Sequence, residues 1–506
     1  MINKSPLHPL IFSIYPILFL FSVNMSEVTF ETILYPFIAS FLGSAILFII
    51  LSVLFRNIAK ASIITSFLLI LFYSFGHLYQ HFPININEVV FAAIYTSIIL
   101  ILLWLIFKFN KVYEINLFLN IVSLVLIMIV LFNIGRVSYV TYMTKLDGIS
   151  PNMIASLDMK PNELPDIYYI ILDSYPSTVT LKRVLDYDNS NFIYFLKNKG
   201  FYVPTKSFSN YPSTGFSLPS ALNMEYIEKI DQNAAECLHS VKDSIIQKNL
   251  ESIGYTFYYF STYNDLGMKN HTNIENKFYD FLIVLHETTL LRLYKINPLI
   301  ISYYQEMRNR VLYTFDRLSK MPGINGRKFL FIHILPPHPP YIFDREGNPV
   351  KNTKSTTAKG WDEKDNYLNQ LIYIEKKSMV LIEQLINKSK RKPIIILQSD
   401  HGSAFTSFRK NASKKEQQQM YFFPSDEALF EMFGNINVYY GPEEFKILLY
   451  DTITPVNTFR IVRNYLFKDD IPLLEDKYYH YHYNRPGTKS KDARLFRDVT
   501  EILINK

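Results

Sequence analysis

Two short apolar runs of the chain end in carboxylate and imidazole side chains. The run 167–172 is followed by Asp173, and the run 394–398 leads through one serine into Asp400 and His401. If both runs are strands of an open α/β sheet, the residues that follow them meet at the edge where such sheets bind their ligands. Carboxylates and imidazoles bind divalent metal ions, so these residues are candidates for a metal-centred site.

Two further segments carry groups that can take part in such chemistry. The segment 210–220 is rich in hydroxyl groups and is typical of a turn that opens into a helix, with Thr214 and Gly215 at its centre. A hydroxyl at a helix N-terminus is a candidate nucleophile, because free backbone N–H groups there favour an anion. His338 stands among four prolines after a third apolar run. His333 lies inside that run, and we expect it to point into the core.

Each of these residues also has a purely structural interpretation. Asp173 and Thr214 are suitable helix N-caps, the sequence Asp400–Gly402 is compatible with a tight turn, and His338 could stiffen a surface loop. Taken singly, such residues are more often structural than catalytic. Taken together, four chemically matched features would have to fall independently at the ends of predicted strands, so both interpretations stay open.

The elements that position these residues follow from the pattern after Pro165. Short β-branched or aromatic runs alternate there with longer amphipathic stretches, which is typical of strands joined by crossover helices. We expect strands at 167–172, 255–260, 329–335, 394–398 and 436–440, and helices at 181–199, 241–253 and 367–386. The expected fold is an α/β domain whose mainly parallel sheet is flanked by helices on both faces.

Before Val137 the chain is dominated by apolar runs that could span a membrane. A helix needs about 20 apolar residues to cross a bilayer. Runs of this length lie at 32–55, 61–79, 89–107 and 115–137. A shorter run at 7–23 is interpreted as a further span rather than a signal peptide, because no small-residue cleavage site follows it. We therefore expect an N-terminal transmembrane bundle of about five helices.

The distribution of Lys and Arg gives these spans a direction. The loops 24–31 and 78–88 contain no Lys or Arg, whereas the alternate loops each contain two. Short loops rich in Lys and Arg stay in the cytoplasm. Five spans with a cytoplasmic N-terminus therefore place everything after Val137 on the non-cytoplasmic side.

We divide the chain into a transmembrane domain at 1–137, a connector at 138–164 and an extracytoplasmic domain at 165–506. The net charge of +7 is spread over 506 residues without a basic stripe, which argues against nucleic acid as a partner. Cys237 is the only cysteine of the sequence, which excludes an intrachain disulfide and a thiolate metal cluster.

The order of these motifs resembles the alkaline-phosphatase and sulfatase superfamily. The resemblance rests on Asp173 after a buried strand, on Thr214 in its hydroxyl-rich turn, and on a late strand that runs into Ser-Asp-His-Gly. It covers the chain from about Pro165 to Phe467. With its five-span anchor the chain is similar to the branch of lipoteichoic acid synthases and phosphoethanolamine or phosphoglycerol transferases.

The resemblance implies a role for each of the four central residues. Thr214 would be the nucleophile, and Asp173, Asp400 and His401 would hold one divalent metal ion, with the Thr214 hydroxyl completing the ligand set. Two carboxylates and one imidazole suit Zn or Mn better than Ca. Coordination would lower the pKa of the threonine hydroxyl and so activate it.

Other residues are implied less directly. The amide of Gly215 and the side chain of His338 would contact oxygens of the transferring group. A second metal ion, present in the two-zinc members of the superfamily, would need further ligands, for which His480 and His482 are the candidates. Sulfatases mature a Cys or Ser in a Cys/Ser-x-Pro-x-Arg motif, and the sequence around Cys237 does not match it. Sulfate esters are therefore the weaker substrate class.

Three functions are compatible with the sequence. The first is a transferase that moves a phospholipid headgroup, phosphoethanolamine or phosphoglycerol, from membrane lipids onto an envelope glycan or lipid. The second is a hydrolase of phosphate or sulfate esters with the same metal core. The third is a non-catalytic membrane receptor or assembly protein. We expect the transferase, as a multi-pass protein of the inner or plasma membrane, because the anchor then places donor and catalyst in one plane.

Overall fold

The computed structural model of the protein describes residues 6–25, 30–80, 82, 87–108, 112–146, 164–227, 237–262, 268, 270–272, 277–293, 297–350, 361, 363–407, 416, 420, 423–483 and 494–504. The chain forms two compact units. The helical unit comprises residues 1–150 and 275–303, and the sheet unit comprises residues 151–274 and 304–506. The division of the sequence at 137 and 164 stays a prediction, and the helical unit additionally takes in a segment from far along the chain.

Apolar helices make up the helical unit. They are α1 (His8–Val23), α2 (Phe30–Phe55), α3 (Ile58–Gln80), α4 (Glu88–Lys108) and α5 (Val112–Leu146), joined by α11 (Lys277–Thr288) and the 3-10 helix η3 (Leu290–Leu293). Among the described residues, α2, α3 and α5 contain stretches long and apolar enough to cross a membrane, at Phe30–Phe55, Ile58–Tyr79 and Val112–Ser138. The apolar stretches of α1 and α4 are shorter. The prediction of five spans therefore stays a prediction.

A polar cluster joins three of these helices. The His8 side chain of α1 is fully buried, and its Nε2 donates to Asn116 Oδ1 of α5 at 2.8 Å while its Nδ1 accepts from Ser66 Oγ of α3 at 2.6 Å. Asn120 Oδ1 accepts from the backbone amides of Leu7 and His8. An unpaired polar group among apolar helices is costly, so these mutual hydrogen bonds select one packing of α1 against α3 and α5.

The sheet unit is built on a five-stranded sheet in the order β2-β3-β1-β4-β5. Its strands are β1 (Ile167–Leu172), β2 (Tyr255–Ser261), β3 (Arg327–Ile334), β4 (Ile394–Gln398) and β5 (Asn437–Tyr440). The first four are parallel to one another, and β5 runs antiparallel to β4. The predicted mainly parallel α/β architecture is confirmed.

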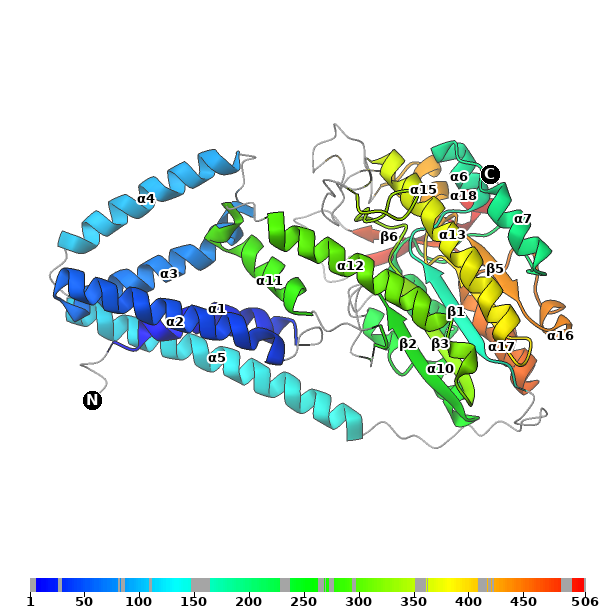
Figure 1. The fold of residues 1–506 in the computed structure, drawn as a ribbon, viewed down its shortest axis with the longest axis horizontal. Helices are drawn as coiled ribbons and strands as arrows, with labels where there is room; N and C mark the ends of the chain where they lie inside the picture. The colour runs from blue at the N-terminus through cyan, green and yellow to red at the C-terminus, as the bar shows by residue number, and fades with distance from the viewer. Residues whose placement is uncertain are drawn as a thin grey trace. The chain divides into compact units, whose positions relative to one another are not determined.

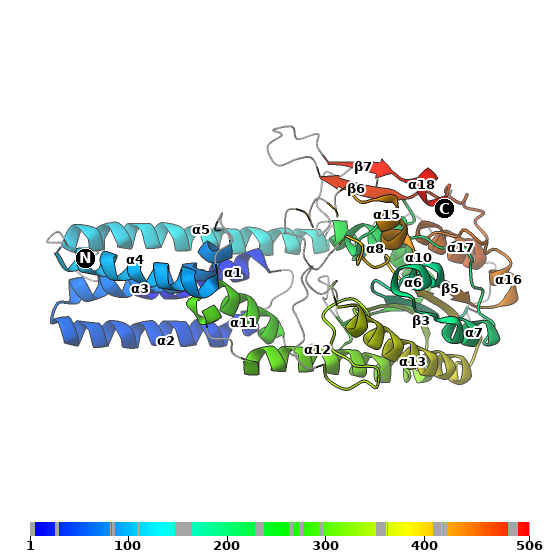
Figure 2. The ribbon, with the colours of Figure 1, turned by 90° about the horizontal axis from the view of Figure 1, so that it is seen from above.

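Helices cover both faces of the sheet. On one face, Tyr169 of β1 and Phe331 of β3 pack with side chains of α8 (Thr214–Asn223), α10 (Ile245–Ser252) and α17 (Pro455–Phe467). Figures 1 and 2 show α12 (Asn297–Leu318) and α13 (Lys364–Lys388) on the opposite face. Every residue of β1 is buried in consequence, which explains why its sequence is a continuous apolar run rather than an alternating one.

Two expected helices differ from those observed. The segment 181–199 forms two helices, α6 (Thr178–Leu185) and α7 (Ser190–Asn198), because Asp186 ends α6 in the left-handed conformation with φ 47°. The segment 241–253 likewise divides into η2 (His239–Val241) and α10. Asp and Asn tolerate this conformation better than other non-glycine residues, and apolar periodicity alone does not report it.

The remaining elements complete the periphery of the sheet unit. They are η4 (Met321–Gly323), α15 (Asp426–Phe433), α16 (Glu443–Lys446), α18 (Thr500–Ile504) and the antiparallel pair β6 (Tyr479–Tyr483) and β7 (Arg494–Asp498). Aromatic residues of β6 and β7 pack on Tyr211 and Phe216, at the start of α8. The β6-β7 pair thus supports the turn that carries Thr214.

A buried carboxylate connects α13 to the segment after β1. Glu375 accepts hydrogen bonds from the hydroxyls of Tyr175 at 2.5 Å and Tyr187 at 2.8 Å. Burial raises the pKa of Glu375 from 4.5 to about 7, although both hydrogen bonds oppose the shift. The network fixes Tyr175, two residues beyond Asp173.

Glu375 is expected to lower the stability of the folded protein as pH rises. Between pH 4.5 and about 7 the folded state holds a proton that the unfolded state has lost, so the free energy of unfolding falls over this window. The full effect is on the order of 3 kcal/mol. Glu375→Gln should therefore raise the melting temperature of the purified chain relative to wild type at pH 8 but much less at pH 5. Glu346→Gln, at an exposed position, is the control, and an equal pH response of the two variants would contradict the prediction.

Candidate metal centre

Two neighbouring parallel strands bring the predicted ligands together. Asp173 follows β1, and Asp400 and His401 follow β4, which pairs with β1. One ligand atom from each of the three residues lies within 4.8 Å of the others, and both carboxylates are buried. Among the described residues, no other group of three potential ligands meets this criterion.

Thr214 completes the cluster from the first turn of α8. Its Oγ1 donates to Asp400 Oδ2 at 2.5 Å and lies 3.4 Å from His401 Nε2. Ser213, not Thr214, is the N-cap of α8, and Ser177, not Asp173, caps the helix after β1. The capping interpretation of both residues is therefore wrong, since the Thr214 hydroxyl faces the carboxylates instead of its own helix.

The orientation of His401 suits a metal ligand. Its Nδ1 donates to the carbonyl of Gly402 at 2.8 Å, which leaves the lone pair of Nε2 for a cation. That Nε2 lies 3.5 Å from Asp400 Oδ2 and 3.7 Å from Asp173 Oδ1. Asp400 Oδ1 accepts from the amides of Ser174 and His401, so Oδ2 is the atom that faces the cluster. Two carboxylates, an imidazole and a hydroxyl fit a divalent ion such as Zn or Mn.

The electrostatics of the cluster favour positive charge. Burial opposes ionisation of Asp173, but the charges of His338 and His401 and a hydrogen bond from His333 outweigh burial and lower the pKa of this carboxyl. Burial opposes protonation of His401, yet Asp400 and Asp173 outweigh it and raise the pKa of the imidazole. A divalent cation would supply the same compensating charge to the two carboxylates.

His333 belongs to the site, contrary to our expectation that it only points into the core. It is buried in β3, but its Nε2 lies 3.1 Å from Asp173 Oδ2. Burial lowers the pKa of the imidazole, but the hydrogen bond to Asp173 and the charges of Asp173 and Asp400 together outweigh burial and raise it. The register of β3 against β1 pairs His333 with Ile171 and so brings it beside Asp173. Only that register could have revealed the contact.

A backbone hydrogen bond holds His338 beside Asp173. Its amide donates to the carbonyl of Asp173 at 3.2 Å, and its Nδ1 donates to the carbonyl of Pro339 at 2.6 Å, which leaves Nε2 for another partner. Gln370 of α13 holds this loop, because its fully buried amide donates to the carbonyls of Pro337 and His338. The proline-rich loop is therefore anchored to the sheet unit.

Glu431 of α15 holds the loop that follows His401, a role that sequence analysis did not predict. Its buried carboxylate accepts from Ser403 Oγ at 2.7 Å and from the amides of Phe405 and Thr406 at 2.6 and 2.8 Å. Burial raises the pKa of Glu431 although these bonds oppose the shift. In the sequence Glu431 is one charged residue of an amphipathic helix, so only the fold reveals its partners.

The other predicted residues have less direct positions. Gly215 is the second residue of α8, so its amide lacks an acceptor within the helix and is available at the N-terminus. His480 and His482 both lie in β6, and His480 is not part of the ligand group found among the described residues, whereas the side chain of His482 lies outside them. The second metal ion stays a prediction.

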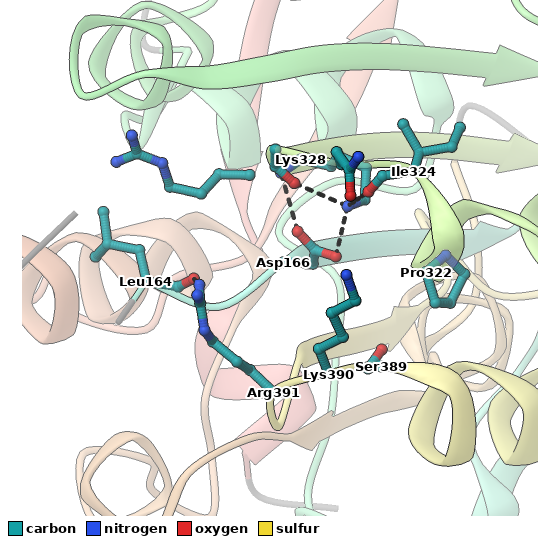
Figure 3. Close-up of a pocket in the computed structure, with 11 residues that line it drawn as sticks. Leu164, Asp166, Pro322, Ile324, Lys328, Ser389, Lys390 and Arg391 are labelled. Carbon is teal, nitrogen blue, oxygen red and sulfur yellow. Dashed lines mark hydrogen bonds and ion pairs between the residues drawn. The ribbon is translucent and has the colours of Figure 1, made fainter. Parts of the chain in front are cut away.

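A separate hollow lies at the opposite edge of the sheet. Figure 3 shows this cavity of about 350 Å³ at the amino ends of β1, β3 and β4, with Lys390 and Arg391 beside it. Lys328 Nζ is satisfied there by Asp166 Oδ2 at 2.9 Å and by the carbonyls of Ile324 and Gly326. None of the residues predicted for the site lines this cavity.

Gly402 is expected to be required for metal binding because it has no room for a side chain. A Cβ at this position would lie 2.0 Å from the carbonyl oxygen of Glu431 and 2.6 Å from that of Gly434. Gly402→Ala should displace His401 and weaken metal affinity by roughly 10- to 100-fold, the range seen when the support of a ligand is removed. Metal titration of the purified protein measures this, with Gly323→Ala, where a Cβ meets nothing within 4 Å, as the control. Unchanged affinity in Gly402→Ala would disprove the requirement.

Comparison with solved structures gives distant similarities. The C-terminal periplasmic domain of EptC from Escherichia coli, in complex with Zn, is 12% identical with a TM-score of 0.42, over 68% of this chain and 95% of that one. The integral membrane lipooligosaccharide phosphoethanolamine transferase A (EptA) from Neisseria meningitidis is 14% identical with a TM-score of 0.40, over 92% of this chain and 96% of that one. A protein of glycosaminoglycan metabolism from Bacteroides thetaiotaomicron is 13% identical with a TM-score of 0.39, over 66% and 84%.

A search of curated proteins gave no match. The model of the sulfatase family matches residues 166–425, which is just over half of the chain. This range contains every central residue of the cluster, from Asp173 to His401. The chain therefore belongs to the sulfatase family, within the alkaline-phosphatase and sulfatase superfamily, and is a sulfatase-like hydrolase or transferase of phosphate or sulfate esters.

Proposed function

We propose that this protein is a membrane-anchored, divalent-metal-dependent phosphotransferase with Thr214 as its nucleophile. It moves a phospholipid headgroup, phosphoethanolamine or phosphoglycerol, onto an envelope glycan or lipid. The observation that carries the proposal is the position of the Thr214 hydroxyl, 2.5 Å from Asp400 Oδ2 and 3.4 Å from His401 Nε2. A hydroxyl with only a structural role would not need two potential metal ligands beside it.

The residues of the cluster divide the reaction between them. A divalent ion held by Asp173, Asp400 and His401 would lower the pKa of the Thr214 hydroxyl and neutralise phosphoryl charge. Thr214 Oγ1 attacks the phosphorus of the donor, its proton passes to Asp400 Oδ2, and the diacylglycerol oxygen leaves and is protonated. An acceptor hydroxyl then attacks the phosphothreonine ester and passes its proton to His338 Nε2, which has given its own proton to the diacylglycerol oxygen. Asp400 Oδ2 returns its proton to the departing Thr214 oxygen, which restores the free hydroxyl.

His338 and Gly215 suit the oxygens of the transferring group. The Nδ1 of His338 is held by a carbonyl, so a protonated Nε2 is the group free to donate to the leaving oxygen. The amide of Gly215, at the N-terminus of α8, suits a non-bridging oxygen. Both donors act on charge that grows as the bond to the leaving oxygen breaks.

The apolar helices support a lipid as the donor. At least three described helices are long and apolar enough to cross a membrane, and an anchored catalyst shares the plane of its donor. We place the protein in the cell membrane as a multi-pass protein with residues 165–506 as the extracytoplasmic catalytic domain. Cys237 packs in an apolar cluster with Tyr211 and Phe216 while Thr214 faces the ligands, which supports phosphate rather than sulfate chemistry.

Transfer requires a modified Thr214 that can be isolated. The full chain is incubated in nanodiscs containing phosphatidylethanolamine or phosphatidylglycerol, without an acceptor, and Thr214 is examined by mass spectrometry. We expect a phosphoethanolamine or phosphoglycerol ester on Thr214 with one of the two lipids. Thr214→Val, which keeps the shape and removes the hydroxyl, should lose at least about a thousandfold of the activity.

Ser213→Ala is the matched control, because Ser213 is adjacent and its side chain makes no capping hydrogen bond. Wild-type turnover of both lipids to free headgroup phosphate, with no transfer when acceptor glycans are supplied, would assign the hydrolase instead. Full activity of Thr214→Val would disprove the nucleophile.

The orientation of the anchor gives a second expectation. A reporter enzyme that is active only outside the cytoplasm should be silent when fused after Lys60 and active when fused after Leu146. The reason is that the loops with Lys and Arg alternate with loops that have none. Activity after Lys60 and silence after Leu146 would reverse the topology and exclude an extracytoplasmic donor.

A further inference from the structure

A segment encoded in the middle of the catalytic sequence belongs to the helical unit. Residues 275–303 group with the N-terminal helices, whereas the chain before and after them forms the sheet unit. The segment contains α11 and η3, and we call residues 277–293 the docked segment. Figures 1 and 2 show its α11 beside the N-terminal helices, and it contacts both α2 and α3.

Apolar side chains fix the docked segment at two places. Phe281 of α11 is 3% exposed and packs in a cluster with Phe21 of α1, Ile33 of α2 and Val130 of α5. At the other end, Leu290 and Leu293 of η3 pack on a second cluster, formed by Phe75 of α3 with Phe91 and Tyr95 of α4. Contacts with five helices exclude a loose association.

A glycine permits close backbone contact between α3 and α11. A Cβ on Gly76 would lie 2.1 Å from the carbonyl oxygen of Glu287 and 2.6 Å from the backbone of Thr288. No side chain fits into this space, and backbone atoms cannot rotate away as the end of a flexible side chain can. Gly76 is therefore a position at which any other residue must displace the docked segment or α3.

An ion-pair network adds specificity to these contacts. Arg292 Nε lies 2.6 Å from Glu88 Oε1 at the start of α4, and Arg292 Nη1 lies 2.5 Å from Glu287 Oε2. The guanidinium also lies over the ring of Tyr79, 5.2 Å from its centroid. The Arg292 side chain is 21% exposed, so solvent screens these interactions only in part.

All these contacts lie at one end of the bundle. Phe21 and Ile33 flank the loop 24–31, and Gly76 and Glu88 flank or approach the loop 78–88. These are the two loops without Lys or Arg, which the charge pattern assigns to the non-cytoplasmic side. A membrane-spanning bundle with this orientation would have the lipid headgroups of the non-cytoplasmic leaflet at this level. Val284 and Leu291 of the docked segment keep exposed apolar side chains there, as the lipid-facing helices do.

We infer that the docked segment is a specificity-determining element that makes the enzyme selective for lipid-borne over water-soluble esters; the inference rests on the proposed function. It acts by covalent restraint. The number of residues alone allows a distance of at most about 60 Å between Leu146 and Leu164, but at most about 14 Å between Leu293 and Asn297 of α12. Since α12 continues into the sheet unit, docking shortens the covalent tether between that unit and the helical unit, and a shorter tether raises the effective concentration of lipid donors. A soluble ester gains nothing from the restraint.

The test separates docking from chemistry. Full-length protein in nanodiscs containing phosphatidylethanolamine and phosphatidylglycerol is assayed for headgroup removal, and the same preparation is assayed with a water-soluble nitrophenyl phosphodiester. We expect Gly76→Ala and Arg292→Glu to lower the lipid reaction by about tenfold or more while the soluble reaction stays within twofold of wild type. Hydrogen exchange of residues 281–293 should increase in both variants.

Two controls make the result specific. Gly135→Ala, where a Cβ meets nothing within 4 Å, should change neither reaction nor exchange. The double variant Glu88→Arg with Arg292→Glu restores opposite charges across the contact and should recover most of the lipid activity. If Arg292→Glu lowered the lipid activity only by unfolding the protein, the added Glu88→Arg substitution would not restore that activity.

Three results would overturn the inference. They are an equal loss of both reactions in Gly76→Ala, faster exchange with an unchanged ratio of lipid to soluble activity, and unchanged exchange in both variants. A wild-type enzyme inactive on lipid but active on the soluble ester would contradict the proposed function, and the role of the docked segment in donor selection would fall with it. If the wild-type enzyme is active on lipid but the variants keep its ratio of lipid to soluble activity, the inference is overturned and the proposed function is not.

Discussion

Asp173 and Asp400 are buried carboxylates at the ends of two neighbouring parallel strands. The free energy that it costs to bury them close together must be offset by the groups that surround them. Two like charges in an interior of low dielectric repel each other strongly and have lost most of their hydration. They persist because imidazoles, backbone amides and the Thr214 hydroxyl surround them. A bound cation would complete this compensation, which gives the site its preference for positive charge.

The residues around the cluster hold its strand ends and loops in place by hydrogen bonds. Ser399 Oγ accepts from the amide of Tyr175, so the segments that follow β1 and β4 are bonded to each other. Asn435, just before β5, donates to the carbonyl of Ser399 and bonds a third segment to them. Glu431 holds the loop after His401, and Gln370 holds the loop of His338. Each of these groups is buried, and each helps to hold a residue of the candidate site in one orientation. Precise placement of this kind is what allows a nucleophile and a metal ion to act together.

The helical unit shows a different use of polar groups. Its His8 cluster lies where apolar helices meet and selects one packing, whereas the pair of Arg292 with Glu88 lies at the end of the bundle and selects one partner segment. In both arrangements each polar group has a partner, because a polar group among apolar helices is tolerated only when it is paired. The second arrangement ties the catalytic sequence to the anchor at a second point, in addition to the connector.

The five strands of the main sheet, the parallel α/β class and the convergence of Asp173, Asp400 and His401 were predictable from the sequence, because buried parallel strands are continuous apolar runs and their carboxyl ends meet at one edge. Thr214 follows no strand, and its place beside these residues was implied by the family resemblance. The number of spans, the metal and the substrate stay predictions. The sequence did not predict that His333 contacts Asp173, that Glu431 and Gln370 hold the two loops, or that residues 275–303 group with the N-terminal helices. These facts depend on strand register and on contacts between residues far apart in the chain, which local periodicity does not encode.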